Sequence, residues 1–333
     1  MRSSQSGLSD SCGKKSQTHM SNLYPGNREH EAWTSMGGLA SGTVSALAVG
    51  WHENATFFAG TRGGLYKTNA LDQPTPPWHS VPGAPLEIIT LAVSPTYAAD
   101  QTILVGGGQG LWISRNGGVD WQAAQLPMPN AIVLCLGFSP NYQTDGIILA
   151  GTLEDGIYAS DSRGVRWSYR SFGLLDSTVY TLAFSPNFAQ DETLFAGTET
   201  ALYYSYNGGR AWKQLDFPEA ATPILSLAVS PHFAQDQTLY AGTEQHGLYR
   251  STDGGHRWQP VGLPTTTINT LAISPDGALL AATDGGLYRL AARAEDWTCL
   301  LEQPDVFSLV LGAGVLIAGL VDGRVWLAGD RIG

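Results

Sequence analysis

Acidic side chains recur at one position of a repeated pattern, and they are the residues best placed to do chemistry. They follow an apolar run that ends in Ala-Gly-Thr or a variant of it. The set comprises Glu154, Asp155, Glu199, Glu244, Asp284 and Asp322, and Arg62 stands at the same position in the first repeat. A ring of carboxylates could bind a cation, a basic peptide or a sugar. The alternative is that Asp and Glu serve only in turns, copied when the repeat was duplicated.

In the second repeat, Gln109 takes the position that the first group of acids holds in other repeats. A second group of acids lies just before the start of a following repeat. This second group comprises Glu87, Asp176, Glu219 and Asp305. We expect both groups on one face of the molecule, around a common mouth. Two of these carboxylates about 5–10 Å apart could hydrolyse a glycosidic bond as acid and base. No residue is assigned a catalytic role, and we treat the first group, with Arg62, as candidate binding residues.

Other chemistries find little support in the sequence. The histidines fall in different repeats without zinc-ligand spacing, and there is no Ser-His-Asp signature, phosphate loop or dinucleotide fingerprint. Asp100, Asp145, Asp191 and Asp236 recur after Ser-Pro-x-aromatic and are expected to cap loops on the opposite face. Each of those loops offers one acid, too few for calcium. We therefore expect no metal and no cofactor.

Charge and composition limit the class of partner. The net charge of −11 argues against nucleic acid, because phosphate binding needs a basic stripe. No apolar run is long enough to span a membrane, and the polar N-terminus has no signal-peptide core. The expected compartment is the cytoplasm, or the outside of the cell if translation starts elsewhere. We expect a monomer.

An internal repeat determines the expected fold. The pattern apolar-x-x-Leu-Ala-apolar-Ser-Pro begins at Ile88, Ile132 (with one extra residue), Val179, Ile224 and Ile268, with weaker copies at Val44 and Val306. Each copy is followed by a second run ending near Ala-Gly-Thr, a third run after a Gly turn, and a Trp. Four short strands in about 45 residues are typical of one propeller blade.

Tryptophan spacing gives the blade count independently. Seven Trp residues recur at spacings of 45, 43, 46, 45, 46 and 39, from Trp33 to Trp297. Trp33 precedes the first complete repeat, and the chain ends after the third strand of the last one. The sequence therefore predicts an all-β, seven-bladed β-propeller of four-stranded antiparallel blades over residues 31–333. Strand 31–36 completes blade 7, because an open ring would leave a free sheet edge. Residues 1–30 are expected to be a disordered polar tail.

Four turns before a Trp share a motif with a known repeat. They run from Ser114 to Trp121, Ser160 to Trp167, Ser205 to Trp212 and Ser251 to Trp258. This resembles the Asp-box, or bacterial neuraminidase (BNR) repeat, Ser-x-Asp-x-Gly-x-Thr-Trp. Asp253 fills the Asp position, whereas Asn116, Ser162 and Asn207 substitute for it, and the Thr is absent. The resemblance implies a BNR-like propeller of the WD40/YVTN-like kind in which these boxes are structural.

Relatives by repeat include sialidases, xyloglucan-cleaving glycosidases and photosystem-assembly factors of the Ycf48/HCF136 type. A sialidase holds its substrate with clustered arginines, but no first-strand segment here contains Arg, Lys or His. The resulting hypothesis is a non-enzymatic scaffold that binds a protein or peptide through one face. A carbohydrate-active propeller is the first alternative. A photosystem-assembly-like factor is the second, although the arginine patch which that resemblance implies is not evident.

Overall fold

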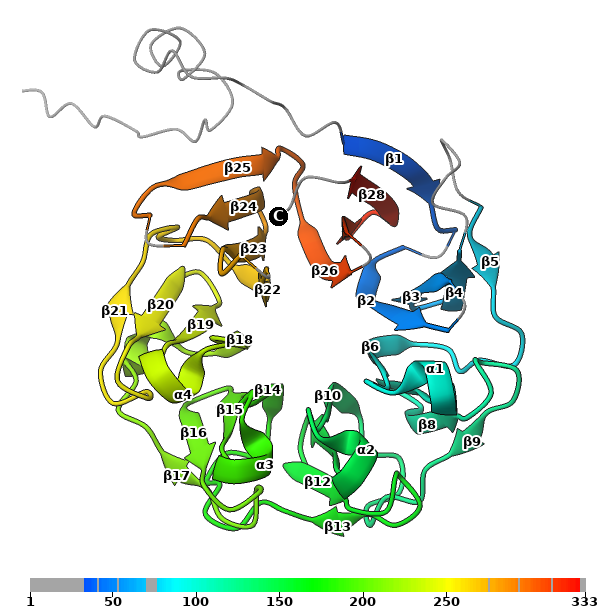
Figure 1. Ribbon diagram of the computed structural model, residues 1–333, viewed down its shortest axis with the longest axis horizontal. Helices are drawn as coiled ribbons and strands as arrows, with labels where there is room; N and C mark the ends of the chain where they lie inside the picture. Colours follow the sequence, from blue (N-terminus) through cyan, green and yellow to red (C-terminus); the bar gives the residue numbers. More distant parts are fainter. Residues whose placement is uncertain are drawn as a thin grey trace, which may run out of the picture. The chain divides into compact units, whose positions relative to one another are not determined.

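The computed structural model describes residues 33–40, 42–52, 54–69, 77–274, 276–292, 294–312 and 314–329. They belong to one compact unit, residues 32–333. Seven four-stranded antiparallel sheets surround a central axis, as the sequence predicted (Figure 1). The predicted polar tail, residues 1–30, lies outside the described residues.

Each blade runs outward from a first strand at the axis to a fourth strand at the rim. The first strands are β2 (Val44–Trp51), β6 (Ile88–Val93), β10 (Val133–Phe138), β14 (Val179–Phe184), β18 (Ile224–Val229), β22 (Ile268–Ile273) and β26 (Val306–Gly312). The second strands are β3 (Ala55–Thr61), β7 (Ile103–Gly107), β11 (Ile148–Thr152), β15 (Leu194–Thr198), β19 (Leu239–Thr243), β23 (Leu279–Thr283) and β27 (Val315–Leu320). The third strands are β4 (Gly64–Thr68), β8 (Gly110–Ser114), β12 (Ile157–Ser160), β16 (Leu202–Ser205), β20 (Leu248–Ser251), β24 (Gly286–Leu290) and β28 (Arg324–Gly329). The fourth strands are β5 (His79–Ser80), β9 (Gln122–Ala123), β13 (Ser168–Tyr169), β17 (Lys213–Gln214), β21 (Gln259–Pro260), β25 (Trp297–Leu301) and β1 (Trp33–Gly38).

The last blade is closed by the first strand of the described chain. Strand β1 pairs antiparallel with β28, and Trp33 lies opposite Ala328. Residues 31 and 32 of the predicted span 31–36 lie outside the described residues, and the strand continues beyond that span to Gly38. Met36 turns inward and is buried. Ring closure by an N-terminal strand is thus confirmed.

Four one-turn helices follow the Ser-Pro motifs and were not predicted. They are α1 (Tyr97–Asp100), α2 (Tyr142–Asp145), α3 (Phe188–Asp191) and α4 (Phe233–Asp236), and a 3₁₀ turn, η1 (Glu219–Ala221), lies elsewhere. Each α-turn ends on the recurrent Asp. In α2, Asp145 accepts a 2.6 Å hydrogen bond from the Ser139 hydroxyl and a 2.9 Å bond from the Ile147 amide. The carboxylate therefore ties the turn to both flanking strands.

Neighbouring blades interlock through a glycine in the second strand. A Cβ placed on Gly197 would lie 2.7 Å from Ile224 Cγ2, so only a residue without a side chain leaves room for Ile224. The same relation recurs in six of the seven blades, with Gly60 and Ile88, Gly106 and Val133, Gly151 and Val179, Gly242 and Ile268, and Gly319 and Val44. In blade 6 the position is taken by buried Ala282, which packs in one cluster with Val306.

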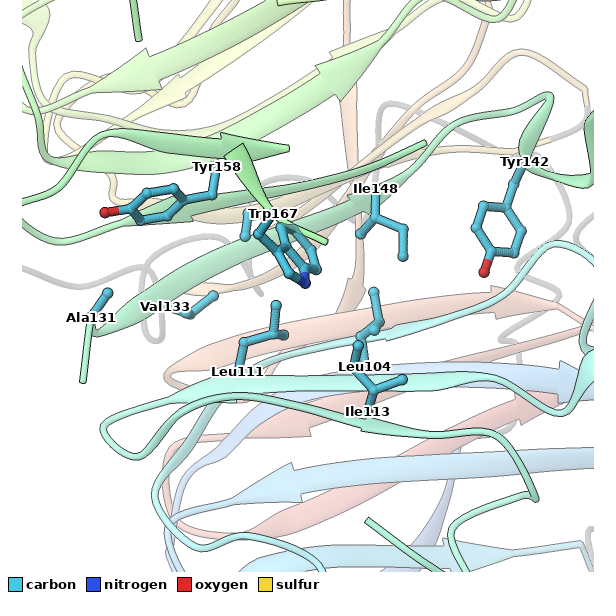
Figure 2. Packing of buried hydrophobic residues seen from close by; sticks show 10 residues of the cluster. Leu104, Leu111, Ile113, Ala131, Val133, Tyr142, Ile148, Tyr158 and Trp167 are labelled. Atoms are coloured by element: carbon cyan, nitrogen blue, oxygen red, sulfur yellow. The ribbon is translucent and has the colours of Figure 1, made fainter. Parts of the chain in front are cut away.

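Buried aromatic and aliphatic side chains fill the wedges between blades. Between blades 2 and 3, Trp167 packs with Leu111 and Ile148, and Val133 lies beside them (Figure 2). Comparable clusters join the other blades. The core is therefore a ring of inter-blade layers, and each blade depends on its neighbours for burial.

Removing β1 tests the closure of the ring. We expect a chain shortened through Gly38 to melt well below a chain shortened through residue 28, because the first loses a paired strand and the buried Met36. Thermal unfolding of both proteins measures the difference. Equal melting temperatures would show that β1 does not close the fold.

Substituting Gly197 tests the interlock. We expect Gly197→Ala to lower the free energy of unfolding by about 1–3 kcal/mol, the usual cost of overpacking a tight core. Gly38→Ala is the matched control, because a Cβ on Gly38 meets nothing within 4 Å. Denaturant unfolding of both variants provides the comparison, and equal stability of the two would contradict the interlock.

Candidate functional site

One face of the ring carries both groups of predicted acids. The loops between second and third strands are residues 62–63, 108–109, 153–156, 199–201, 244–247, 284–285 and 321–323. In an antiparallel blade these loops lie at the same end as the segments that lead into the next blade. Backbone hydrogen bonds join the two kinds of loop directly, as from Glu87 N to Arg62 O (2.9 Å) and from Asp305 N to Asp284 O (3.0 Å). We call this end the mouth face.

Buried threonines fix the geometry of the acidic loops. The hydroxyl of Thr152 donates to the carbonyl of Gly156 at 2.8 Å and accepts the amide of Asp155 at 3.0 Å. Thr61, Thr198, Thr243 and Thr283 likewise donate across their loops, at 2.7–3.0 Å. These threonines are fully buried. The Thr of Ala-Gly-Thr thus holds the hairpin that presents the following acid to solvent.

The mouth acids differ in how they are paired. Arg62 lies 4.0 Å from Glu87, and Arg324 lies 2.6 Å from Asp322. Among the residues that the structure describes, Glu154, Glu199 and Glu244 form no ion pair, and all three are exposed. Blades 3 to 5 therefore present a sector of unneutralised negative charge. Asp155 and Asp284 lie on the same face, in the loops of blades 3 and 6.

Asp176 holds two loops of this sector together. Its carboxylate accepts hydrogen bonds from Thr178 N at 3.0 Å and from both Thr200 N and Thr200 Oγ1 at 2.8 Å. Partial burial alone would raise the pKa of Asp176, but these hydrogen bonds outweigh it and lower the pKa below its usual value. Asp176 is thus a positioning residue for the loop that carries Glu199.

A β-bulge at the start of every first strand shapes the axial channel. The pairing register shifts by one residue directly after Val44, Ile88, Val133, Val179, Ile224, Ile268 and Val306. The third repeat thus begins at Val133, and the prediction of an extra residue after Ile132 was wrong. The bulged residues are Ser45, Ile89, Leu134, Tyr180, Leu225, Asn269 and Phe307, and all of them line one cavity of about 490 Å³.

The cavity wall is mostly apolar, and two of its side chains are notably accessible. Ile89 and Phe307 are each 37% exposed although they lie on the innermost strands. Glu87 and Asp305 precede these residues by two positions, so the cavity opens toward the mouth face. The pKa of the Tyr180 phenol is raised by burial and then by the charges of Glu199, Glu244 and Asp176. The acidic sector therefore acts electrostatically on the cavity.

Polar groups of the wall are directed into the backbone. Ser45 Oγ donates to Ile88 O at 2.6 Å, Ser226 Oγ to Ile268 O at 3.0 Å and Ser308 Oγ to Val44 O at 2.6 Å. Asn269 and Thr270 donate to carbonyls of blade 7 in the same way. Burial raises the pKa of the Cys135 thiol to about 12, so this thiol stays neutral. Each of these donors joins one blade to the next.

The four Asp-box turns lie at the other end of the blades, between third and fourth strands. In the box of blade 5, Ser251 Oγ accepts the Gly255 amide at 2.9 Å and Asp253 accepts the Arg257 amide at 2.9 Å. The corresponding amides are accepted by Asn116, Ser162 and Asn207 at 2.9 Å. The indoles of Trp121, Trp167 and Trp258 donate to a box glycine carbonyl, whereas Trp212 donates to Arg170 O. These groups stabilise turns remote from the mouth.

Sequence reasoning missed the bulges, and with them the cavity. The available signal was an apolar residue at the second position of the repeat, where Ile89, Leu134, Tyr180, Leu225 and Phe307 stand. The alternation of a strand does not show which of two adjacent apolar residues turns toward the axis.

Among the described residues, no group of three or more His, Cys, Asp or Glu side chains gathers as in a metal site. In that same part of the chain, no helix is long and apolar enough to cross a membrane.

Comparison with known proteins identifies a family and a common fold. A family model described as photosynthesis system II assembly factor YCF48 matches residues 119–298, more than half of the chain. No curated protein matches.

Three solved structures illustrate the fold. The extracellular domain of the one-component system BT4673 from B. thetaiotaomicron is 16% identical (TM-score 0.70), with 91% of this chain and 40% of that chain covered. The GH74 xyloglucanase from Xanthomonas campestris is 19% identical (TM-score 0.67), with 90% and 54% covered. The computationally designed Ika8 protein is 14% identical (TM-score 0.60), with 89% and 99% covered. The chain thus spans about half or less of the two natural proteins, and these likenesses show the fold alone.

Neutralising Asp176 gives a pH-dependent test of the site's construction. Its lowered pKa means that the carboxylate stabilises the fold above the unfolded-state pKa of about 3.9, and that this stability is lost as pH falls through the folded-state value. We expect Asp176→Asn to cost about 1 kcal/mol at neutral pH, a low value because the group is half-exposed and screened. The cost should decrease between neutral pH and about pH 3, and it should disappear only below the folded-state pKa.

Glu199→Gln is the control for this experiment, because Glu199 is exposed on the loop that Asp176 holds. Denaturant unfolding at both pH values measures all three proteins. A cost for Asp176→Asn that persisted in acid would contradict the assigned role of the carboxylate.

Proposed function

This chain belongs to the family of the photosynthesis system II assembly factor YCF48, and we propose that it is a non-enzymatic assembly scaffold that binds a protein or peptide through the mouth face. The observation that carries the proposal is the acidic sector of blades 3 to 5. Glu154, Glu199 and Glu244 are exposed there, with no ion pair among the described residues. Such a surface is complementary to a cationic partner and speeds its association.

Exposed apolar side chains on the segments between blades support a protein partner. Phe172 is 77% exposed, Leu175 is 85% exposed and Leu86 is 50% exposed. All three lie in segments that lead from a fourth strand into the next blade. Phe172 and Leu175 share the segment between blades 3 and 4, the same segment that carries Asp176, and aromatic side chains are enriched in protein interfaces.

Two features favour a scaffold over a carbohydrate-active propeller. Ser45, Ser226 and Ser308 of the cavity wall donate their hydroxyls to backbone carbonyls of the next blade, so these groups are not available to a sugar. The mouth carboxylates with a shifted pKa, Asp176 and Asp322, both have a lowered value. A glycosidase acid needs a raised one.

The family description favours a role in assembly. Under this proposal the partner is a subunit of a complex that is still being built, and photosystem II is that complex in a host that makes one. The mouth face would then shield or position a basic segment of the subunit until assembly proceeds.

Differential affinity capture from the native host tests the proposal. We expect the wild-type chain to recover a partner that is lost with Glu154→Gln/Glu199→Gln/Glu244→Gln, because that variant removes three charges from the acidic sector. The matched control, Asp120→Asn/Asp161→Asn/Asp296→Asn, removes three exposed acids from the opposite face, none of which forms an ion pair among the described residues. Quantitative mass spectrometry compares the three samples.

Recovery of no reproducible partner, or equal losses with both triple variants, would overturn the proposal. Circular dichroism of the three proteins checks that the substitutions leave the fold intact.

A further inference from the structure

We propose that the axial cavity takes one apolar side chain from a lysine- or arginine-rich segment of the partner, while the acidic sector holds the flanking cationic residues. The inference rests on the proposed function and deepens it. It names the chemistry of the bound segment and the residues that receive its anchor.

The cavity is a mostly apolar pocket that is lined by side chains from all seven blades. Its volume of about 490 Å³ is within the range of small-molecule and peptide-anchor pockets. Ile89, Leu134, Leu225 and Phe307 project into it from four different bulges. Ile89 and Phe307 retain 37% exposure at this position, so an apolar group that enters would remove them from water.

The polar part of the wall discriminates against a polar occupant. Ser45, Ser226, Ser308, Asn269 and Thr270 direct their donors to carbonyls of the neighbouring blade. The hydroxyls of Thr90, Tyr180 and Thr181 also line the cavity, so a polar occupant would regain only some of the hydrogen bonds that it loses from water. An aliphatic or aromatic side chain carries no such cost.

The acids of the mouth face favour cationic residues on either side of the apolar side chain that enters the cavity. After burial, the charges of Glu199, Glu244 and Asp176 raise the pKa of the Tyr180 phenol, which lies in the cavity wall. Glu199 and Glu244 are exposed and form no ion pair among the described residues, so they remain available to a ligand. An acidic segment would be repelled from this rim, and a basic one attracted.

Binding of short peptides to the folded chain tests the inference. The probes are Lys-Lys-Gly-Phe-Gly-Lys-Lys, the same peptide with Ser in place of Phe, and Glu-Glu-Gly-Phe-Gly-Glu-Glu. Isothermal titration or fluorescence anisotropy measures each Kd. We expect the basic Phe peptide to bind about tenfold more tightly than the Ser peptide, as for burial of one apolar side chain. The acidic peptide should not bind.

Two variants separate the anchor from the charge. Phe307→Ala should weaken the basic Phe peptide about tenfold and leave the Ser peptide unchanged, because only the apolar contact is lost. Tyr206→Ala is the matched control, an exposed aromatic on the opposite face. Glu199→Gln/Glu244→Gln should weaken both basic peptides and reduce their dependence on salt. Ile89→Ser repeats the test if Phe307→Ala lowers the melting temperature.

Three results would overturn the inference. These are equal Kd values for the Phe and Ser peptides, an equal effect of Phe307→Ala and Tyr206→Ala, or no binding of any basic peptide. The proposed function would still stand if affinity capture of the partner depends on the acidic sector. Failure of the capture experiment as well would remove both proposals. Binding of a xyloglucan oligosaccharide that Phe307→Ala abolishes would assign the cavity to carbohydrate instead.

Discussion

The structure depends on one packing contact that is repeated around the ring. A β-branched residue opens each first strand, and in six of the seven junctions it fills the space that the preceding blade leaves by having glycine in its second strand. Ala282 takes that position before Val306. Because the two strands belong to different blades, the contact fixes both the spacing and the angle between neighbours. Val44 against Gly319 is the same contact between blades 1 and 7, so closing the ring requires no special interface, only the fourth strand that β1 supplies.

The same contact creates the candidate site. The residue after each β-branched position is the bulged one, and the bulge turns its side chain toward the axis. Hydroxyls such as Ser226 and Ser308 then tie this region to the next blade. The blade interface thus determines the apolar wall of the cavity, while the buried threonines determine where the acids stand. Fold and site are two consequences of one repeat unit.

Much of this could be predicted from the sequence. Seven evenly spaced Trp residues gave the blade count, and Trp33 lies in the strand that closes the ring. The family match agrees with the resemblance in the Asp-box turns. The bulges were not predicted because Ile88 and Ile89 are chemically alike. Only the pairing of the strands in three dimensions shows which of these two side chains is buried. The one-turn helices escaped because four residues give no helical period. Whether the mouth acids bind anything depends on their pairing in space, which spacing along the chain does not reveal.

A seven-fold ring of identical loops would offer a partner several equivalent positions. The arginines make the loops of some blades differ from the others. Arg62 lies near Glu87, and Arg324 is paired with Asp322, so the arc of blades 7, 1 and 2 is partly neutralised. The opposite arc keeps Glu154, Glu199 and Glu244. A symmetric acidic ring would hold a basic segment in any of several orientations around the axis. Under the proposed function, this uneven ring would favour one placement of the basic segment across the mouth, as a scaffold that positions its partner requires.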